Sequence, residues 1–129
     1  MLCRTGAALG YGNLLNFLQE EPEKLLNTIQ KAKAVIIPSY YEGFGLQILE
    51  SLSNKTNVIA SNTSSLPEVG KSACLYFNPK DPQDIASTTN KLLSSKKLQT
   101  KLLSKYQKIK KNFSYTKMTS KTHKLYKNI

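Results

Sequence analysis

Three short runs of branched apolar residues recur along the middle of the chain. They are AVIIPS (34–39), NVIAS (57–61) and ACLYFN (73–78), and each has the length and composition of a strand. The first is continuous and is stopped by a proline, which predicts burial on both faces. A fourth run, NLLNFLQ (13–19), precedes them, and segments with helical spacing lie between and around these runs. Because strands that alternate with helices pair in parallel, the sequence predicts an α/β fold: a parallel sheet with flanking helices.

The predicted helices carry ordinary end signals. Residues 20–33 begin with acids and a proline and end with lysines, which suits the helix dipole. A helix is also expected over 45–54, whereas 62–72 is rich in turn-forming residues. From Asp81 onward the pattern is helical, and we expect a last helix over 115–129. One apolar stripe lies on this lysine-rich part, formed by Leu98, Leu102, Tyr106, Ile109 and Phe113.

The positive charge is confined to one end of the chain. The formal net charge is +11, yet residues 1–84 carry seven Lys or Arg against eight Asp or Glu. Residues 85–129 carry twelve lysines and no acidic residue. A polycation of this kind predicts contact with nucleic acid, an anionic membrane or only water. The segment lacks arginine and any base-reading motif, so nucleic acid is the least favoured partner.

Length and cysteine usage set further bounds. A chain of 129 residues suits one domain with a modest core, which we place at 13–129, with basic helices at 85–129 and residues 1–12 unassigned. Cys3 and Cys74 lie far apart without metal-binding spacing, so we interpret them as reduced thiols of a cytoplasmic protein, with a disulfide as the alternative. No apolar run approaches the roughly 18 residues that a membrane-spanning helix needs.

The stretch PSYYEGFGLQILESL (38–52) holds the candidate site. Gly43 and Gly45 suit a turn at the end of a strand, and the N–H groups of the helix that follows would attract phosphate. Glu50 lies five residues beyond Gly45, about 7–8 Å along a helix, where its carboxylate could accept hydrogen bonds from sugar hydroxyls. The alternative is a glycine-rich turn before a core helix, with Glu50 merely exposed.

This stretch resembles the signature of the retaining glycosyltransferases of family 4, which have the GT-B fold. That signature places seven residues between two glutamates, and the matching residues are Pro38, Ser39, Glu42, Gly43, Phe44, Gly45, Leu46, Leu49 and Glu50. The likeness continues through NVIAS, SSLPEVG, ACLYFNPKDPQDIA and NFSYTKM, and covers about residues 13–120. It implies the C-terminal, Rossmann-like half of a two-domain enzyme, the half that binds a nucleotide-sugar donor.

The resemblance also implies roles for single residues. Glu42 would lie at the reacting end of the donor sugar, as the catalytic residue, and Glu50 would bind the ribose hydroxyls. The backbone of Gly43, Phe44, Gly45 and Leu46 would meet the diphosphate and the sugar. Ser39 and Glu68 are candidates for the cleft, whereas Tyr40 and Tyr41 either border the donor pocket or, as we prefer, pack half-buried.

We expect no metal and no cofactor besides the donor. The family does not rely on an Asp-x-Asp metal site, and the chain contains none. Asp81 and Asp84 are expected to open a helix instead. His123 is the only histidine, so no Ser-His-Asp or Cys-His set can be assembled.

Three residues depart from the family pattern. Lys55 and Asn57 stand where a glycine and a proline are usual, and Lys71 stands where a glycine is common. We expect these departures to affect local stability more than binding. The acceptor-binding domain and the basic pair that neutralises the diphosphate have no counterpart, so we expect a truncated enzyme whose acceptor domain another chain could supply.

The expected function is transfer of a sugar from a nucleoside-diphosphate sugar to an alcohol acceptor, with retention. Two alternatives stay open. One is a non-catalytic basic module that binds polyanions or an anionic membrane surface. The other is a decayed glycosyltransferase remnant that binds no donor. The expected location is cytoplasmic, with peripheral contact at the inner membrane face as a variant of the same prediction.

Overall fold

The computed structural model describes residues 22–113, 119–120 and 123–124. The segment 1–12 and the predicted strand 13–19 therefore lie outside the described residues, as does most of the predicted helix 115–129. The described elements follow in the order α2 (Pro22–Lys31), β1 (Ala34–Ile37), α3 (Leu46–Ser53), β2 (Asn57–Ser61), α4 (Leu66–Gly70), the 3-10 turn η1 (Lys71–Ala73), β3 (Leu75–Phe77), α5 (Pro82–Leu93), α6 (Lys96–Lys110) and the 3-10 turn η2 (Lys111–Phe113).

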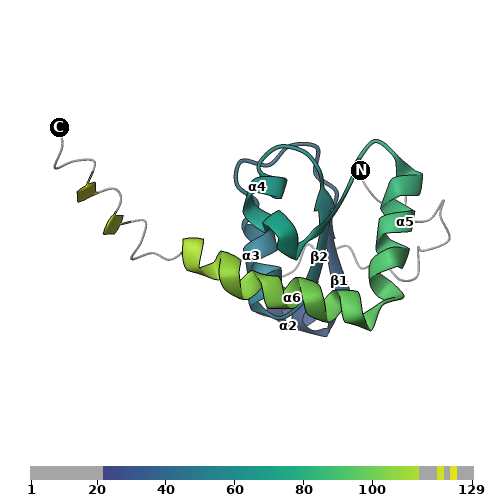
Figure 1. Cartoon of the computed structure of the whole chain (residues 1–129), viewed down its shortest axis with the longest axis horizontal. Helices are drawn as coiled ribbons and strands as arrows, with labels where there is room; N and C mark the ends of the chain where they lie inside the picture. Colours follow the sequence, from purple (N-terminus) through teal and green to yellow (C-terminus); the bar gives the residue numbers. More distant parts are fainter. Residues whose placement is uncertain (1–21, 114–118, 121–122, 125–129) are drawn as a thin grey trace.

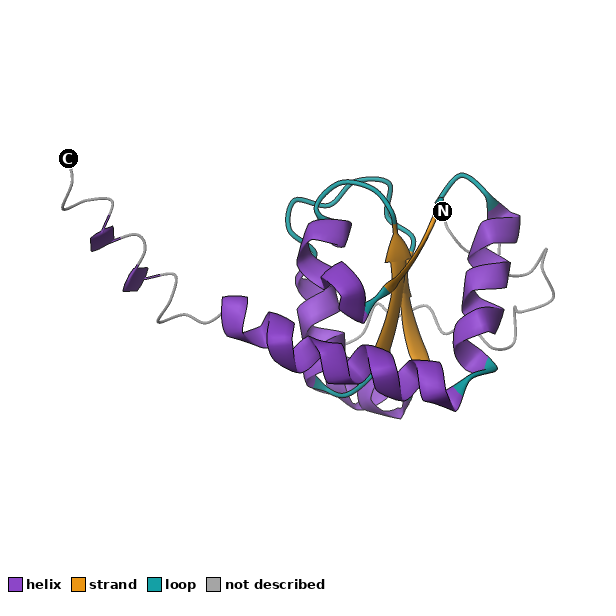
Figure 2. Cartoon of the chain, viewed as in Figure 1, coloured by secondary structure: helices purple, strands orange, loops and turns teal. Residues whose placement is uncertain are grey.

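The three strands form one parallel sheet in the order β1-β2-β3. Ala34 pairs with Asn57 at the start of β1, and Ser61 pairs with Phe77 at the end of β2. Figure 1 shows α5 on one side of the strands and α3 with α4 on the other, while α6 crosses beneath them. Figure 2 shows the loops that follow the strands gathered at the opposite end from α6.

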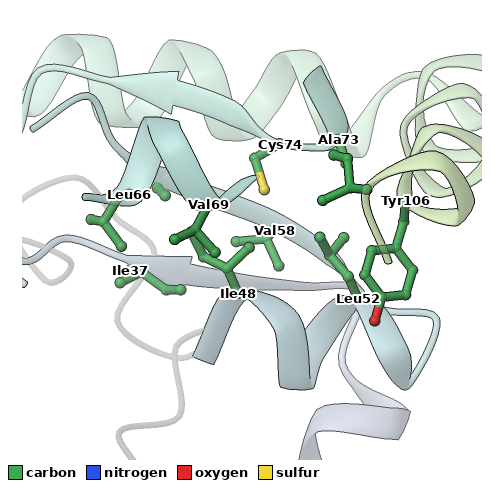
Figure 3. Close-up of a cluster of buried hydrophobic side chains, with 11 residues drawn as sticks. Ile37, Ile48, Leu52, Val58, Leu66, Val69, Ala73, Cys74 and Tyr106 are labelled. Atoms are coloured by element: carbon green, nitrogen blue, oxygen red, sulfur yellow. The ribbon is translucent and has the colours of Figure 1, made fainter. Parts of the chain in front are cut away.

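The two faces of β2 bury different clusters, because successive side chains of a strand point to opposite faces. Val58 and Ala60 join the larger cluster, which also contains Ile48 and Leu52 of α3. Figure 3 shows side chains of this cluster from β1, β2, α3, α4 and α6 meeting one another. Ile59 faces the smaller cluster with Phe77, Leu92 and Leu102. Helix α6 contributes to both clusters, which fixes it across the domain.

Each of the three strands predicted within the described residues is present, two of them with shorter bounds. The predicted strand 73–78 is β3 over Leu75–Phe77, because Ala73 belongs to η1. NVIAS forms β2 over the predicted residues, and all five are buried. The predicted strand 34–39 ends at Ile37, directly before the proline. Both of its faces contact the core, as predicted, since Val35 packs against the larger cluster and Ala34 and Ile36 pack against the smaller one. Ala34, Val35 and Ile36 are only half-buried, because β1 is an outer strand of the described sheet.

The helix predictions were incomplete at two places. The predicted turn 62–72 contains α4 and the start of η1, since Leu66 and Val69 bury one face of a short helix there. The C-terminal helical pattern is divided at Ser95, whose hydroxyl accepts a hydrogen bond from the N–H of Leu98 at 3.2 Å and caps α6. The apolar stripe is buried at Leu102, Tyr106 and Ile109 but not at Phe113.

Asp81 opens α5, as predicted. Its carboxylate accepts hydrogen bonds from the N–H groups of Gln83 at 2.9 Å and Asp84 at 3.3 Å. Asp84 in turn accepts a 2.7 Å bond from the N–H of Asn78, which ties the end of β3 to the start of α5.

No helix within the described ranges is long and apolar enough to cross a membrane.

Candidate functional site

A loop over residues 38–45 joins the carboxyl end of β1 to the first turn of α3. Gly45 is the residue before that helix, with φ 89° and ψ 46°, and no side chain caps the helix there. The first turn closes through the N–H of Ile48, which donates to the carbonyl of Gly45 at 3.1 Å. An uncapped helix N-terminus presents free N–H groups and a partial positive charge, which suits an anion.

The two glycines of the loop have different reasons to be glycine. Gly45 has a left-handed φ, and a Cβ there would lie 2.8 Å from Cδ2 of Leu66. A side chain at this position would be strained and would also clash. A Cβ at Gly43 would meet nothing within 4 Å, and Gly43 has no positive φ. The expectation of unusual φ therefore holds for Gly45 alone, while Gly43 leaves open space beside the backbone.

Glu42 is fastened to the loop that follows β2. Its carbonyl accepts hydrogen bonds from the hydroxyls of Ser64 at 2.6 Å and Ser65 at 2.8 Å, and its N–H donates to Ser64 Oγ at 3.2 Å. Thr63 adds a 3.3 Å bond from its hydroxyl to the carbonyl of Ser39. These bonds fix the backbone in the first half of the loop 38–45, which we call the glycine loop.

The side chain of Glu42 is held as well. Its Oε1 accepts a 2.8 Å hydrogen bond from the hydroxyl of Ser39, and both residues are half-buried. Ser39, predicted as a cleft residue, is thus placed where it orients a carboxylate.

Glu50 lies in the second turn of α3 and is exposed. Among the described residues, its carboxylate has no hydrogen-bond or ion-pair partner. Its backbone carbonyl accepts bonds from Ser53 and Asn54 at the end of the helix. Leu46, the first residue of α3, is also exposed.

An open hollow of about 250 Å³ lies beside the loop. Its lining residues come from the loop, from α4 with the adjoining Ser65 and Lys71, and from the end of the C-terminal helical region: Gly43, Phe44, Ser65, Glu68, Val69, Lys71 and Phe113. Of the predicted site residues it brings together Gly43, Phe44 and Glu68. Glu42, Glu50, Ser39, Gly45 and Leu46 do not line it.

Tyr40 and Tyr41 were expected to be half-buried, and this was wrong. Their exposed fractions are 61% and 81%, because no described element covers this part of the loop.

Four residues of the hollow were not predicted as site residues: Ser65, Val69, Lys71 and Phe113. Phe113 was assigned to the apolar stripe of the C-terminal helix, yet its ring packs edge-on against Phe44, with centroids 5.9 Å apart and planes at 85°. Lys71 has φ 44° and ψ −129°, a conformation that suits glycine. Its departure from the family pattern was the only available signal.

A buried thiol and a phenol lie next to α4. The hydroxyl of Tyr76 donates to the carbonyl of Lys71 at 2.9 Å. Burial raises the pKa of Cys74 to about 12, and burial together with Cys74 raises the pKa of Tyr76 above its ordinary value. Cys74 therefore stays protonated near neutral pH, which disfavours a role as a nucleophile. The described part of the chain holds no group of three His, Cys, Asp or Glu residues that could bind a metal.

Known proteins match the chain over almost its whole length. The model of the family "Glycosyl transferases group 1" matches residues 2–112. An O-antigen chain mannosyltransferase B of Escherichia coli is 32% identical over 126 residues, which are 98% of this chain and 32% of that protein. A D-inositol 3-phosphate glycosyltransferase of Corynebacterium jeikeium (strain K411) is 33% identical over 94% of this chain and 30% of its own length.

Solved structures share the fold. A glycosyltransferase from Rickettsia africae ESF-5 superposes with a TM-score of 0.78 at 22% identity, over 95% of this chain and 34% of that one. A sucrose-phosphate synthase from Thermosynechococcus elongatus gives a TM-score of 0.71 at 22% identity, over 95% and 32%. These likenesses confirm the predicted fold class, a Rossmann-like parallel sheet with flanking helices as in GT-B glycosyltransferases.

The chain spans about a third of the length of these relatives and structures. The family model covers most of the chain, and two relatives of at least 32% identity match nearly all of it. The chain therefore belongs to the glycosyl transferases group 1 family.

Proposed function

We propose that this chain forms the donor-binding half of a retaining family 4 glycosyltransferase. The enzyme would transfer a sugar from a nucleoside diphosphate to an alcohol acceptor. One observation carries the proposal: the uncapped N-terminus of α3, directly after Gly45, is flanked in the sequence by two carboxylates. Glu42 is oriented by its hydrogen bond from Ser39, and the carboxylate of Glu50 has no partner among the described residues. Membership of the glycosyltransferase family supports the same reading.

In this proposal the protein acts mainly through fixed dipoles. The free N–H groups of α3 stabilise the negative charge that grows on the departing diphosphate. The open space at Gly43 lets the diphosphate approach the backbone. Glu50 accepts hydrogen bonds from the ribose hydroxyls, and Glu42 lies beside the donor sugar with its rotamer set by Ser39. No metal and no cofactor besides the donor takes part.

The acceptor site and the basic groups opposite the diphosphate would come from another domain, in the same protein or in another chain. Mannose is the first sugar to test, because several relatives are named as mannosyltransferases.

Titration calorimetry tests the proposal directly. The full chain is titrated with ADP, GDP, UDP, CDP and dTDP, and then with the mannose and glucose conjugates of the tightest binder. We expect one base to bind clearly better than the others, without efficient sugar transfer by the isolated chain. Absence of binding at millimolar ligand would favour the decayed remnant, and robust transfer would show that no further domain is needed.

We also propose a peripheral contact with an anionic membrane, which rests on a different observation. Lys97, Lys101, Lys105 and Lys108 recur every three or four residues on α6, beside the buried Leu102, Tyr106 and Ile109; Lys105 is half-buried and the other three are exposed. Residues 85–113 contain no acidic side chain to offset them. We call these four residues the lysine face. Lysines near an anionic leaflet contribute about 1 kcal/mol each, so such a face can hold the protein at a membrane surface.

A further inference from the structure

The glycine loop is held firmly at both ends but weakly in its middle. Upstream, Glu42 is bound through its N–H and its carbonyl to Ser64 and Ser65. Downstream, the carbonyl of Gly45 accepts the hydrogen bond from Ile48 that closes the first turn of α3. Between them, Gly43 has open space on the side where a Cβ would point, and Phe44 is 45% exposed.

The described contact that holds this middle part comes from the other end of the chain. Phe113 lies in η2, directly after α6, and its ring meets the ring of Phe44 edge to face at 5.9 Å. Such T-shaped geometry is a preferred arrangement for aromatic pairs, since the positive ring edge meets the negative ring face. The position of Phe113 is fixed by the helix before it, because Tyr106 and Ile109 anchor the last turns of α6 in the core.

This contact bears on the backbone that the proposed function assigns to the diphosphate. The N–H groups of residues 43–46 bind an anion well only if they are already aligned when it arrives. A ring that fixes Phe44 also fixes the peptide groups on either side of it. Phe113 lies 69 residues after Phe44 in the sequence. The two rings therefore meet only in the folded chain.

We propose that Phe113 is a positioning residue for the donor: it holds Phe44 against the end of α6 and so pre-orders the diphosphate-binding backbone of residues 43–46. This inference rests on the proposed donor site. It assigns to the C-terminal helical region a role in donor binding besides covering the sheet.

Two measurements on the full chain test it. The first is amide hydrogen exchange of residues 43–46 without ligand, which reports the order of the loop whether or not a donor binds. The second is titration with the tightest-binding nucleoside diphosphate. For Phe113→Ala we expect faster exchange in this loop and three- to tenfold weaker binding. Phe113→Tyr keeps the ring and should restore both to wild-type values.

Three further variants make the result specific. Leu93→Ala removes an apolar side chain of similar exposure, 40%, from the end of α5 and should change neither quantity. Phe113→Leu keeps apolar bulk without the ring, and replaces Phe113→Ala if that variant fails to fold. In the double variant with Phe44→Ala, the loss should be no larger than for Phe113→Ala alone, as expected of residues that act together.

The outcomes separate this inference from the proposed function. Unchanged exchange and unchanged affinity in Phe113→Ala, together with weaker binding in Glu50→Gln, would overturn the role of Phe113 and leave the donor site standing. Failure of the wild type to bind any nucleoside diphosphate would overturn the donor site and the positioning role together.

Discussion

Lys71 and Lys55 are two positions at which this chain differs from the usual residue of its family. Both were identified from the sequence as replacements for glycine, and both have positive φ, at 44° and 61°. Asn57, which replaces a proline, has a buried Oδ1 without a hydrogen-bond donor among the described residues. These departures lie outside the glycine loop and concern the stability of the domain.

Restoring glycine at Lys71 should stabilise the domain. A residue with a side chain in such a conformation costs of order 1–3 kcal/mol. Glycine removes that strain but adds about 0.5–1 kcal/mol of conformational entropy to the unfolded chain. We therefore expect Lys71→Gly to raise the free energy of unfolding by about 1 kcal/mol in urea denaturation. Ser72→Gly is the matched control, since Ser72 has no positive φ and should only lose stability. Equal losses in both variants would contradict the strain argument.

The two glutamates of the site should separate by ligand. A hydrogen bond to a charged group contributes about 1.5–3 kcal/mol, so Glu50→Gln should weaken nucleoside-diphosphate binding roughly 10- to 100-fold. Glu42→Gln should weaken nucleoside-diphosphate binding less than Glu50→Gln does, because the proposed partner of Glu42 is the sugar. For the same reason, Glu42→Gln should weaken binding of the sugar conjugate more than binding of the free diphosphate. Calorimetry with both ligands measures the difference, and unfolding curves check that each variant folds. Equal losses with the free diphosphate would refute this division of roles.

At the scale of elements, the sequence predicted the bounds of a helix or strand well where local patterns alone determine them. β2 and α3 fall within a residue of their predicted bounds, and Asp81 opens α5 as expected. The prediction missed α4, because turn-forming residues outnumber the two apolar residues, Leu66 and Val69, that make it a helix in the folded core.

Contacts between distant segments could not be predicted in this way. The resemblance pointed to Glu42, but its bonds to Ser64 and Ser65 depend on how the loops after β1 and β2 meet. The contact of Phe44 with Phe113 likewise depends on the path of α6 across the domain. Spacing along the chain carries no signal for either contact, since each partner was assigned to a different local pattern.

The cap of α5 allows a test at this scale. Asp81→Ala removes the acceptor for two N–H groups, those of Gln83 and Asp84, and should lower the free energy of unfolding by about 1 kcal/mol. Asp81→Asn keeps an oxygen acceptor of comparable capping strength, so its stability should stay close to that of the wild type. Thermal and urea unfolding give both values. A large loss in Asp81→Asn would mean that charge, rather than the cap, stabilises this helix.

At the scale of the whole molecule, charge is the property that the fold leaves unexplained. Residues 1–84 are almost neutral, whereas the rest of the chain carries twelve lysines and no acid. Lysine stems can cover apolar surface while their ammonium groups stay in water, so a solvated helix surface is the competing explanation. The proposed membrane contact of the lysine face differs from that explanation in one respect: it requires binding to an anionic surface.

Vesicle co-sedimentation decides between these explanations. We expect the full chain to sediment with vesicles that contain anionic lipid but not with neutral vesicles, and to be released as salt rises, because screening weakens exposed charges. Replacing the four residues of the lysine face by glutamine should weaken binding by two to three orders of magnitude, at about 1 kcal/mol for each lysine. The matched control replaces four exposed lysines elsewhere, Lys24, Lys31, Lys33 and Lys80, and gives the same net charge. Equal losses in the two variants would show that net charge alone attracts the protein. If the wild type stays in the supernatant with anionic vesicles at low salt, the membrane contact is excluded and the lysines only solvate α6.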